Sequence, residues 1–225
     1  MRMKKYAIIV AGGSGKRMQT ETPKQVLKLS NQPSLLFTLK QFYPADKAIN
    51  LLVVLPKDHI DTWEALCAQY DFTVPHQVVE GGQERFFSVK NGLDEISGDG
   101  LVAIHDGVRP FVSVQKINNA FIETKKLRAT TLAVPLKDSI RILDKNGSKA
   151  VDRDAYQLVQ TPQTFHLSLI KKAYEQPFLG ALTDDASVVE ALGETVCLIE
   201  GDYTNIKITS PEDLVIGEAI LASLK

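Results

Sequence analysis

The chain has 225 residues, of which 44% are hydrophobic and 24% charged, with a formal net charge of -1 at pH 7. This composition supports a folded core and gives no general attraction for nucleic acid or an anionic membrane, so we expect neither as a partner. The two cysteines, Cys67 and Cys197, lie far apart, without the spacing of a metal site or a disulfide framework. We therefore expect a cytoplasmic protein in a reducing compartment.

Short runs of β-branched and apolar residues alternate with segments of helical spacing along the chain. The apolar runs predict strands at 6–11, 50–55, 74–81, 101–106, 130–135 and 195–201. The helical spacing predicts helices near 34–43, 58–70, 84–96, 114–126, 167–176, 184–192 and 211–224. This alternation predicts one α/β domain over residues 1–225, with a mostly parallel sheet covered by helices on both faces. Ligands of such sheets bind at the carboxyl ends of the strands.

The first predicted strand runs into a glycine loop, "AIIVAGGSGKRM", residues 7–18. It is not a Walker A loop, because Gly15-Lys16 is followed by Arg17 rather than Ser or Thr. It is not a dinucleotide fingerprint either, because Met18 stands where the third glycine would be. What remains is a set of bare backbone amides suited to phosphate oxygens, followed by the bases Lys16, Arg17 and Lys24. Taken alone, the loop is equally typical of a strand-to-helix turn with solvated bases.

One region departs from the alternation of strands and helices. The segment 136–165 contains strand-like stretches on either side of Asn146-Gly147, a strong hairpin signal. We interpret residues 136–160 as a protruding β-arm. Because an isolated two-stranded ribbon is marginally stable, we expect the arm to pack on a second copy of the chain and form a homodimer.

Seven motifs occur in an order that resembles a known family. They are "AGGSGKRM", "TPKQ" (22–25), "EGGQERFFSV" (80–89), "HDGVRPF" (105–111), "VQTPQTF" (159–165), "LTDDASVVE" (182–190) and "GDYTNIKITSPEDL" (201–214). Together they resemble the cytidylyltransferases that act on polyol phosphates, most closely the 2-C-methyl-D-erythritol 4-phosphate cytidylyltransferase family. The resemblance implies a Rossmann-like sheet, a homodimer joined by β-arms, and Mg²⁺ as cofactor. The implied reaction joins CTP to methylerythritol phosphate and releases pyrophosphate.

The chemistry implied by the resemblance assigns roles to the glycine loop. An acceptor phosphate oxygen attacks the α-phosphorus of CTP, so cations must offset the charge that develops there. We expect Arg17 and Lys24 to stabilise the pentacoordinate α-phosphate and Lys16 to help hold the β- and γ-phosphates. The backbone expected to wrap the triphosphate includes Ala11, Gly12, Gly13 and Gly15.

Two further motifs are expected to contact the nucleotide. Asp106 ends a predicted strand, where a carboxylate suits Mg²⁺, although a turn cap would also explain it. Arg109 matches the nucleotide-contacting arginine of the family, and His105 is expected to be a packed strand-end histidine because the ionised acceptor phosphate needs no general base. In the family, the segment around Gly81, Gly82 and Ser88 reads cytosine and ribose. This sequence has Gln83 where many members have Asp.

The acceptor phosphate needs cations of its own. Lys207 and Arg153 match the family residues that position methylerythritol phosphate, and in the family this arginine comes from the arm of the neighbouring subunit. Ser139 and Thr161 match hydroxyls near the same phosphate. The adjacent carboxylates at 184 and 185 fit a capped helix start at least as well as acid/base or metal chemistry, so we leave them out of the site.

Two other functions remain open at this point. A ribitol-5-phosphate cytidylyltransferase would share the glycine loop, "TPQTF" and a similar ending, and only a few arm residues would choose between the two polyols. A non-catalytic nucleotide-binding protein would keep the fold but not the chemistry. The presence of Arg17, Lys24, Asp106, Arg153 and Lys207 favours the enzyme.

Overall fold

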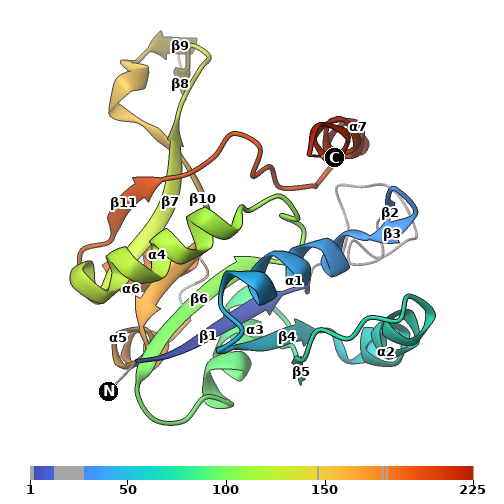
Figure 1. The fold of residues 1–225 in the computed structure, drawn as a ribbon. Helices are drawn as coiled ribbons and strands as arrows, with labels where there is room; N and C mark the ends of the chain where they lie inside the picture. Colours follow the sequence, from blue (N-terminus) through green and yellow to red (C-terminus); the bar gives the residue numbers. More distant parts are fainter. Residues whose placement is uncertain (1–2, 13–27, 146, 179, 181, 225) are drawn as a thin grey trace.

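The computed structural model describes residues 3–12, 28–145, 147–178, 180 and 182–224. Within them, seven strands form a central sheet in the order β11-β7-β10-β6-β1-β4-β5 (Figure 1). The strands are β1 (Lys4–Val10), β4 (Ile49–Leu55), β5 (Gln77–Glu80), β6 (Gly100–Asp106), β7 (Ala129–Pro135), β10 (Gln157–His166) and β11 (Cys197–Glu200). The β5 strand is shorter than the predicted 74–81, since Pro75 lacks the N–H that a ladder requires.

Most neighbouring strands of the sheet are parallel. Strand β1 pairs in parallel with both β4 and β6, β5 with β4, and β11 with β7. Only β10 is antiparallel, to β6 on one side and β7 on the other. The predicted mostly parallel α/β sheet is therefore confirmed, and the carboxyl ends of β1, β4, β5 and β6 share one edge.

Helices cover both faces of the sheet, as predicted. They are α1 (Ser34–Ala45), α2 (Ile60–Gln69), α3 (Arg85–Asp94), α4 (Val114–Leu127), α5 (Leu167–Ala173), α6 (Asp185–Ala191) and α7 (Pro211–Ser223). Along β1, Ile8 and Val10 pack in a core with α3, α5 and α6, whereas Ala7 and Ile9 pack with α1, α2 and α4. Burial on both faces explains why the central strands are continuous apolar runs.

A hairpin projects from the body of the molecule (Figure 1). Strands β8 (Arg141–Asp144) and β9 (Gly147–Ala150) pair antiparallel, and all eight positions are exposed. Gly147 has φ +136°, a conformation that favours glycine, in agreement with the predicted turn. The predicted arm, 136–160, runs too far, because Gln157 already pairs with Pro135 inside the central sheet. The strand-like pattern after the hairpin belongs to β10, whose later residues are buried.

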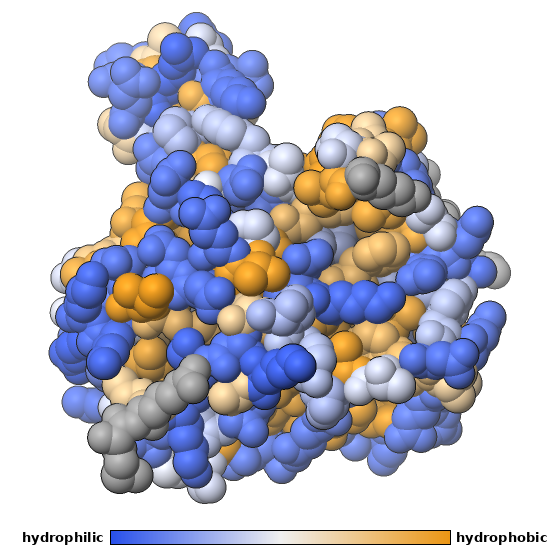
Figure 2. Space-filling view, in the orientation of Figure 1, coloured by the Kyte–Doolittle hydropathy of each residue, from blue (hydrophilic) through white to orange (hydrophobic). Residues whose placement is uncertain are grey.

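The last helix, α7, packs at the side of the sheet. Ser210 and Asp213 form a capping box at its start, and the helix begins at Pro211, where the helical spacing predicts it. A small core of Leu29, Phe111 and Ile208 lies beneath the helix. Figure 2 shows a hollow between the mostly hydrophilic arm and the apolar surface near α7. No helix in the described part of the chain is long and apolar enough to cross a membrane.

Candidate active site

The loops after β1, β4 and β5 line a cavity of about 540 Å³, which we call the glycine cavity. Its lining residues are Gly12, Pro56, His59, Gly82, Gln83, Glu84, Arg85 and Ser88. A Cβ atom at position 82 would lie 2.3 Å from Cβ of Phe87, so only glycine fits this bend. At Gly12 the nearest atom to a Cβ would be Ser88 Oγ at 3.7 Å, which leaves room toward the cavity.

The Ser88 hydroxyl shapes the bend of the glycine cavity. It accepts the Gly82 N–H at 3.1 Å and donates to the Glu84 carbonyl at 3.1 Å. At two other predicted backbone positions the N–H groups bond within the sheet, since Ala11 donates its N–H to the Val54 carbonyl and Gly81 donates its N–H to the Leu55 carbonyl. Gly12 and Gly82 are therefore the predicted glycines that line the cavity among the described residues.

A second, smaller cavity of about 180 Å³ lies beside Asp106, and we call it the aspartate cavity. It is lined by Arg85, Asp106, Arg109, Val159, Gln160, Thr161, Gln163, Thr183, Asp184 and Lys207. Arg85 lines both cavities. Neither Arg85 nor Thr183 was predicted to be a site residue, although each lies in one of the seven motifs. A base in the first turn of a helix, three residues after a glycine pair at a strand end, is the signal that marks Arg85.

Three cations from the described residues lie around the Asp106 carboxylate. Lys207 Nζ lies 2.9 Å and Arg109 Nε 3.3 Å from Oδ2, while Arg85 Nε lies 3.8 Å from Oδ1. Burial by itself would raise the pKa of the Asp106 carboxyl. Lys207, Arg85 and Arg109 outweigh that penalty and hold the pKa well below its usual range. Asp106 is therefore ionised at neutral pH.

His105 lies fully buried behind Asp106 and is neutral. Its Nε2 lies 3.0 Å from the Arg109 carbonyl oxygen, which can only accept, so Nε2 carries the proton. Its Nδ1 then accepts from the Thr161 hydroxyl at 3.0 Å. Burial lowers the pKa of His105 to about 4, with smaller opposing contributions from its hydrogen bonds. The predicted packed histidine is confirmed.

Strand β10 brings Thr161 to Asp106. The register of β10 against β7 shifts between Gln160 and Gln163, and in this irregular stretch the Thr161 hydroxyl accepts the Asp106 N–H at 3.0 Å. Gln160 holds the loop before Lys207 through a 2.7 Å bond from Nε2 to the Asp202 carbonyl. The "QTPQ" motif therefore ties the Lys207 loop to the end of β6.

Helix α6 is tied to the same strand. Gln163 donates to the Asp184 carboxylate at 2.7 Å and accepts the Ala186 N–H at 2.9 Å. Asp184 and Ser187 form a capping box, which confirms the capped helix start. Asp185, by contrast, is fully buried and paired with Arg85.

The structure does not bring every predicted residue to the two cavities. Ser139 and Arg153 lie exposed at the base of the arm, where Arg153 donates to the Lys137 carbonyl at 2.7 Å. Neither lines a described cavity of this chain. The predictions for Gly13, Gly15, Lys16, Arg17 and Lys24 fall outside the described residues.

The donor set near Asp106 fits a divalent cation that is held mainly by a nucleotide. Oδ1 receives no hydrogen bond from the described residues, and Nε of Arg85 lies 3.8 Å from it. No group of three or more His, Cys, Asp or Glu side chains within the described ranges could hold a metal ion. Magnesium commonly takes one or two protein carboxylates and completes its shell with phosphates and water, so one carboxylate oxygen is sufficient.

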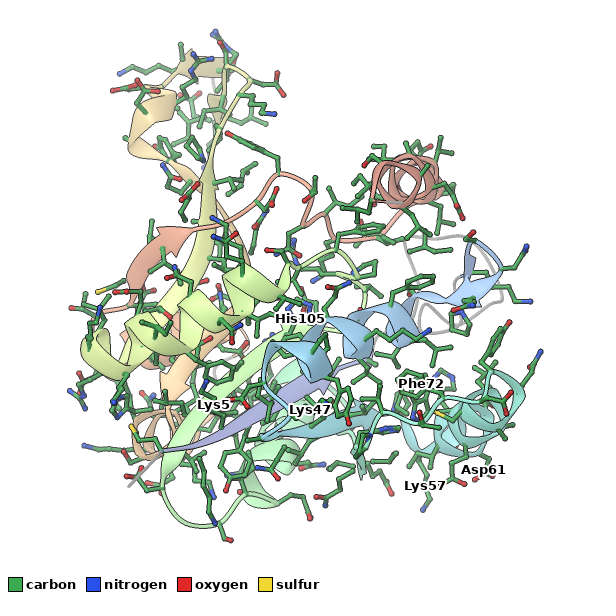
Figure 3. All side chains as sticks on the ribbon, viewed as in Figure 1. Lys5, Lys47, Lys57, Asp61, Phe72 and His105 are labelled. Carbon is green, nitrogen blue, oxygen red and sulfur yellow. The ribbon has the colours of Figure 1, made fainter. Side chains whose placement is uncertain are left out.

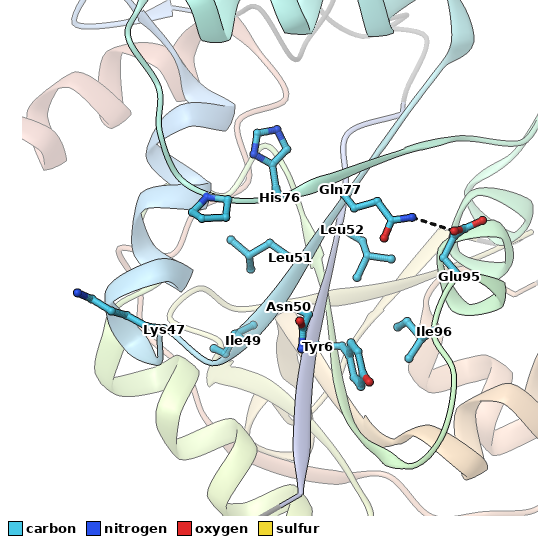
Figure 4. A pocket seen from close by; sticks show the side chains of 11 residues that line it. Tyr6, Lys47, Ile49, Asn50, Leu51, Leu52, His76, Gln77, Glu95 and Ile96 are labelled. Atoms are coloured by element: carbon cyan, nitrogen blue, oxygen red, sulfur yellow. Dashed lines mark hydrogen bonds between the residues drawn. The ribbon is translucent and has the colours of Figure 1, made fainter.

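A third cavity, of about 470 Å³, lies at the other edge of the sheet. Tyr6, Asn50 and His76 are among its lining residues, and a Gln77–Glu95 hydrogen bond crosses its rim (Figure 4). The labelled side chains of Lys5 and Lys47 mark this amino edge in Figure 3. None of the predicted site residues lines it. The carboxyl edge, where parallel sheets bind ligands, is the better candidate.

Fold and site together define a mostly parallel α/β protein with a cation-lined cavity at the carboxyl edge of its sheet. Residues 5–223 match the family model described as 2-C-methyl-D-erythritol 4-phosphate cytidylyltransferase (IspD). The chain belongs to this family.

The chain is similar to curated relatives and to solved structures over nearly its whole length. The enzyme of this name from Bacteroides fragilis is 47% identical over 219 residues, which cover 97% of this chain and 100% of the relative. The one from Porphyromonas gingivalis strain ATCC 33277 is 46% identical over 224 residues, which cover 99% of this chain and 100% of the relative. The structure of 4-diphosphocytidyl-2C-methyl-D-erythritol synthase from Anaerococcus prevotii superposes with a TM-score of 0.84 at 30% identity, covering 98% of this chain and 96% of the other.

Proposed function

We propose that this protein transfers CMP from CTP to 2-C-methyl-D-erythritol 4-phosphate, giving 4-diphosphocytidyl-2-C-methyl-D-erythritol and pyrophosphate in non-mevalonate isoprenoid synthesis. The observation that carries the proposal is the family match over residues 5–223. The two cavities at the carboxyl edge supply a place for donor and acceptor beside one ionised carboxylate.

In the proposed reaction, an acceptor phosphate oxygen forms a bond to the α-phosphorus of CTP, and the bond from that phosphorus to the bridging oxygen breaks. The electron pair leaves with pyrophosphate. No proton has to be removed from the ionised acceptor phosphate, which is consistent with a neutral, buried His105 that takes no part. Arg17 and Lys24 are proposed to stabilise the charge at the α-phosphorus, and Lys16 to hold the outer phosphates.

The nucleotide is proposed to occupy the glycine cavity. The close bend at Gly82, fixed by Ser88, presents backbone groups to the base, and Gly12 leaves space for the phosphates. Mg²⁺, when bound by the phosphates and Asp106, would neutralise part of the triphosphate charge. Arg109 would then act on the nucleotide indirectly. It holds the Asp106 carboxylate and donates a 2.8 Å hydrogen bond to the Asn205 carbonyl.

The acceptor phosphate is proposed to bind at Lys207 in the aspartate cavity. Thr161, which also lines this cavity, would hold Asp106 in place by accepting its N–H. We also propose a cytoplasmic homodimer in which the arm of each subunit supplies Arg153 and Ser139 to its neighbour. The exposure of both residues, away from the cavities of their own chain, supports this arrangement.

The decisive experiment measures pyrophosphate release by the purified protein with CTP and Mg²⁺. Methylerythritol 4-phosphate and ribitol 5-phosphate are compared at equal concentrations. We expect strong preference for methylerythritol phosphate. Preference for ribitol phosphate would keep the chemistry and overturn the pathway, whereas CTP binding without release with either acceptor would indicate a non-catalytic nucleotide binder.

A further inference from the structure

The adjacent carboxylates of the "LTDDAS" motif serve different purposes. Asp184 caps α6 by accepting the Ser187 N–H at 2.9 Å. Asp185 is 0% exposed and accepts both terminal nitrogens of Arg85, at 2.9 and 2.6 Å. It also accepts a hydrogen bond from the Tyr174 hydroxyl at 2.6 Å. A fully buried carboxylate with three such bonds fixes the guanidinium in one orientation.

This orientation decides how Arg85 meets Asp106. The terminal nitrogens of Arg85 are directed at Asp185, so only Nε approaches Asp106, and it stays 3.8 Å from Oδ1, beyond hydrogen-bond range. Lys207 and Arg109 both contact the other oxygen, Oδ2. No hydrogen bond from the described residues reaches Oδ1, although the Asp106 side chain is only 10% exposed. Within the described part of the chain, one oxygen of a largely buried carboxylate therefore has an ion-pair partner at 3.8 Å but no hydrogen-bond donor.

We propose that Asp185, supported by Tyr174, is a positioning residue that holds Arg85 away from Asp106 and so reserves Oδ1 for the divalent cation of the CTP complex. The inference rests on the proposed function for its nucleotide. Without the charge of Asp185, Asp106 becomes the nearest carboxylate to Arg85. A shift of about 1 Å would then bring the guanidinium into hydrogen-bond range of Oδ1, where it competes with the cation.

The test measures Mn²⁺ binding in the presence of CTP and the absence of acceptor. The electron paramagnetic resonance signal of free Mn²⁺ is the readout. Asp185→Asn keeps the shape of the side chain and removes its charge. We expect its Mn²⁺ affinity to fall about tenfold, as estimated from the stronger attraction of a guanidinium that moves into contact with a carboxylate in a partly buried site. Tyr174→Phe should weaken binding in the same direction by less.

A second substitution separates positioning from packing. In the double variant Arg85→Gln/Asp185→Asn the competing cation is gone, so Mn²⁺ affinity should return to within about threefold of wild type, a coupling that independent sites would not show. Asp46→Asn removes the carboxylate that faces Lys5 at 3.2 Å on the amino edge and is the matched control, with unchanged Mn²⁺ affinity expected.

Unchanged Mn²⁺ affinity in Asp185→Asn, or a double variant that binds no better than the single one, would overturn the inference. If Asp185→Asn does not fold, unchanged affinity in Tyr174→Phe overturns it. Wild-type protein that binds no Mn²⁺ with CTP also contradicts it. The proposed function fails separately, through wild-type protein that binds Mn²⁺ and CTP but releases no pyrophosphate with either polyol phosphate.

Discussion

Lys207 illustrates how a cation that is proposed to bind phosphate is held in place by a carboxylate before a ligand binds. Its Nζ lies 2.9 Å from Asp106 Oδ2, and its side chain is still 40% exposed. The exposed side of the ammonium group can donate hydrogen bonds to a phosphate while the group stays in contact with the carboxylate. The ion pair therefore keeps the charge at the place where the acceptor phosphate is proposed to bind.

Replacing Lys207 by glutamine should weaken acceptor binding. A hydrogen bond to a charged group contributes about 1.5–3 kcal/mol, so we expect Lys207→Gln to raise the KM for methylerythritol phosphate roughly 10- to 100-fold. The KM for CTP should change much less. Steady-state kinetics with each substrate varied in turn would measure both. Lys116→Gln, which removes a cation 3.4 Å from Glu200 outside both cavities, is the control. An increase confined to the KM for CTP would contradict the assignment.

The neutral state of His105 makes a prediction about pH. Its pKa falls from 6.5 to about 4 on folding, so between these values the unfolded chain binds a proton that the folded chain does not. Stability is therefore retained above pH 6.5 and lost as the pH falls toward 4. The full displacement corresponds to about 3 kcal/mol.

Urea unfolding at several pH values would measure this loss. In His105→Gln the corresponding contribution should be absent, so its free energy of unfolding should depend less steeply on pH over the same interval. Equal slopes in the two proteins would contradict the neutral assignment. Below this interval, the lowered pKa of Asp106 adds a further loss, since its ionised form is stabilised in the folded state.

At the scale of elements, the two glycines of the glycine cavity should respond differently to alanine. At Gly12 the added methyl group fits the protein and occupies cavity space, so we expect unchanged thermal stability and a KM for CTP raised roughly tenfold. At Gly82 the methyl group would collide with Phe87, so Gly82→Ala should also lower the melting temperature. Thermal unfolding and CTP kinetics of both variants test this contrast. Equal losses of stability would contradict it.

The sequence predicted the elements better than the contacts of the site. Apolar runs and helical spacing located the parallel strands because both faces of the sheet are buried. The start of strand β10 was assigned to the arm because its first residues, such as Leu158 and Val159, are exposed apolar residues like those of the hairpin. A pattern along one chain does not show that Gln157 pairs with Pro135.

The same limit applies to single residues of the site. Asp106, Lys207 and Thr161 were predicted from motifs and lie together. The role of Asp185 was not predicted, because its partner Arg85 is 100 residues away in the chain and the adjacent Asp184 satisfies the capping pattern by itself. Long-range charge pairs of this kind become visible only in the folded structure.

At the scale of the whole molecule, the exposed apolar residues of the arm predict an interface. Leu143 is 80% and Ile142 55% exposed. We expect Leu143→Glu to shift a homodimer toward monomer in sedimentation experiments, because a charge in an apolar contact is costly. If the arm supplies Arg153 to its neighbour, the KM for the acceptor should rise at the same time. Val215→Glu, on α7 with 72% exposure, is the control. A Leu143→Glu protein that remains dimeric would contradict the proposed interface.

The pairing of Pro135 with Gln157 also bears on how this protein can change in evolution. The arm leaves one strand and returns to the adjacent one, so insertions or deletions beyond that pair alter its reach without moving any register of the central sheet. The loops of β1, β4 and β5 that are proposed to recognise the nucleotide are separate in sequence. If the arm pairs subunits and contacts the acceptor as proposed, changes within this one short insertion can alter both properties while the loops proposed to bind the nucleotide stay unchanged.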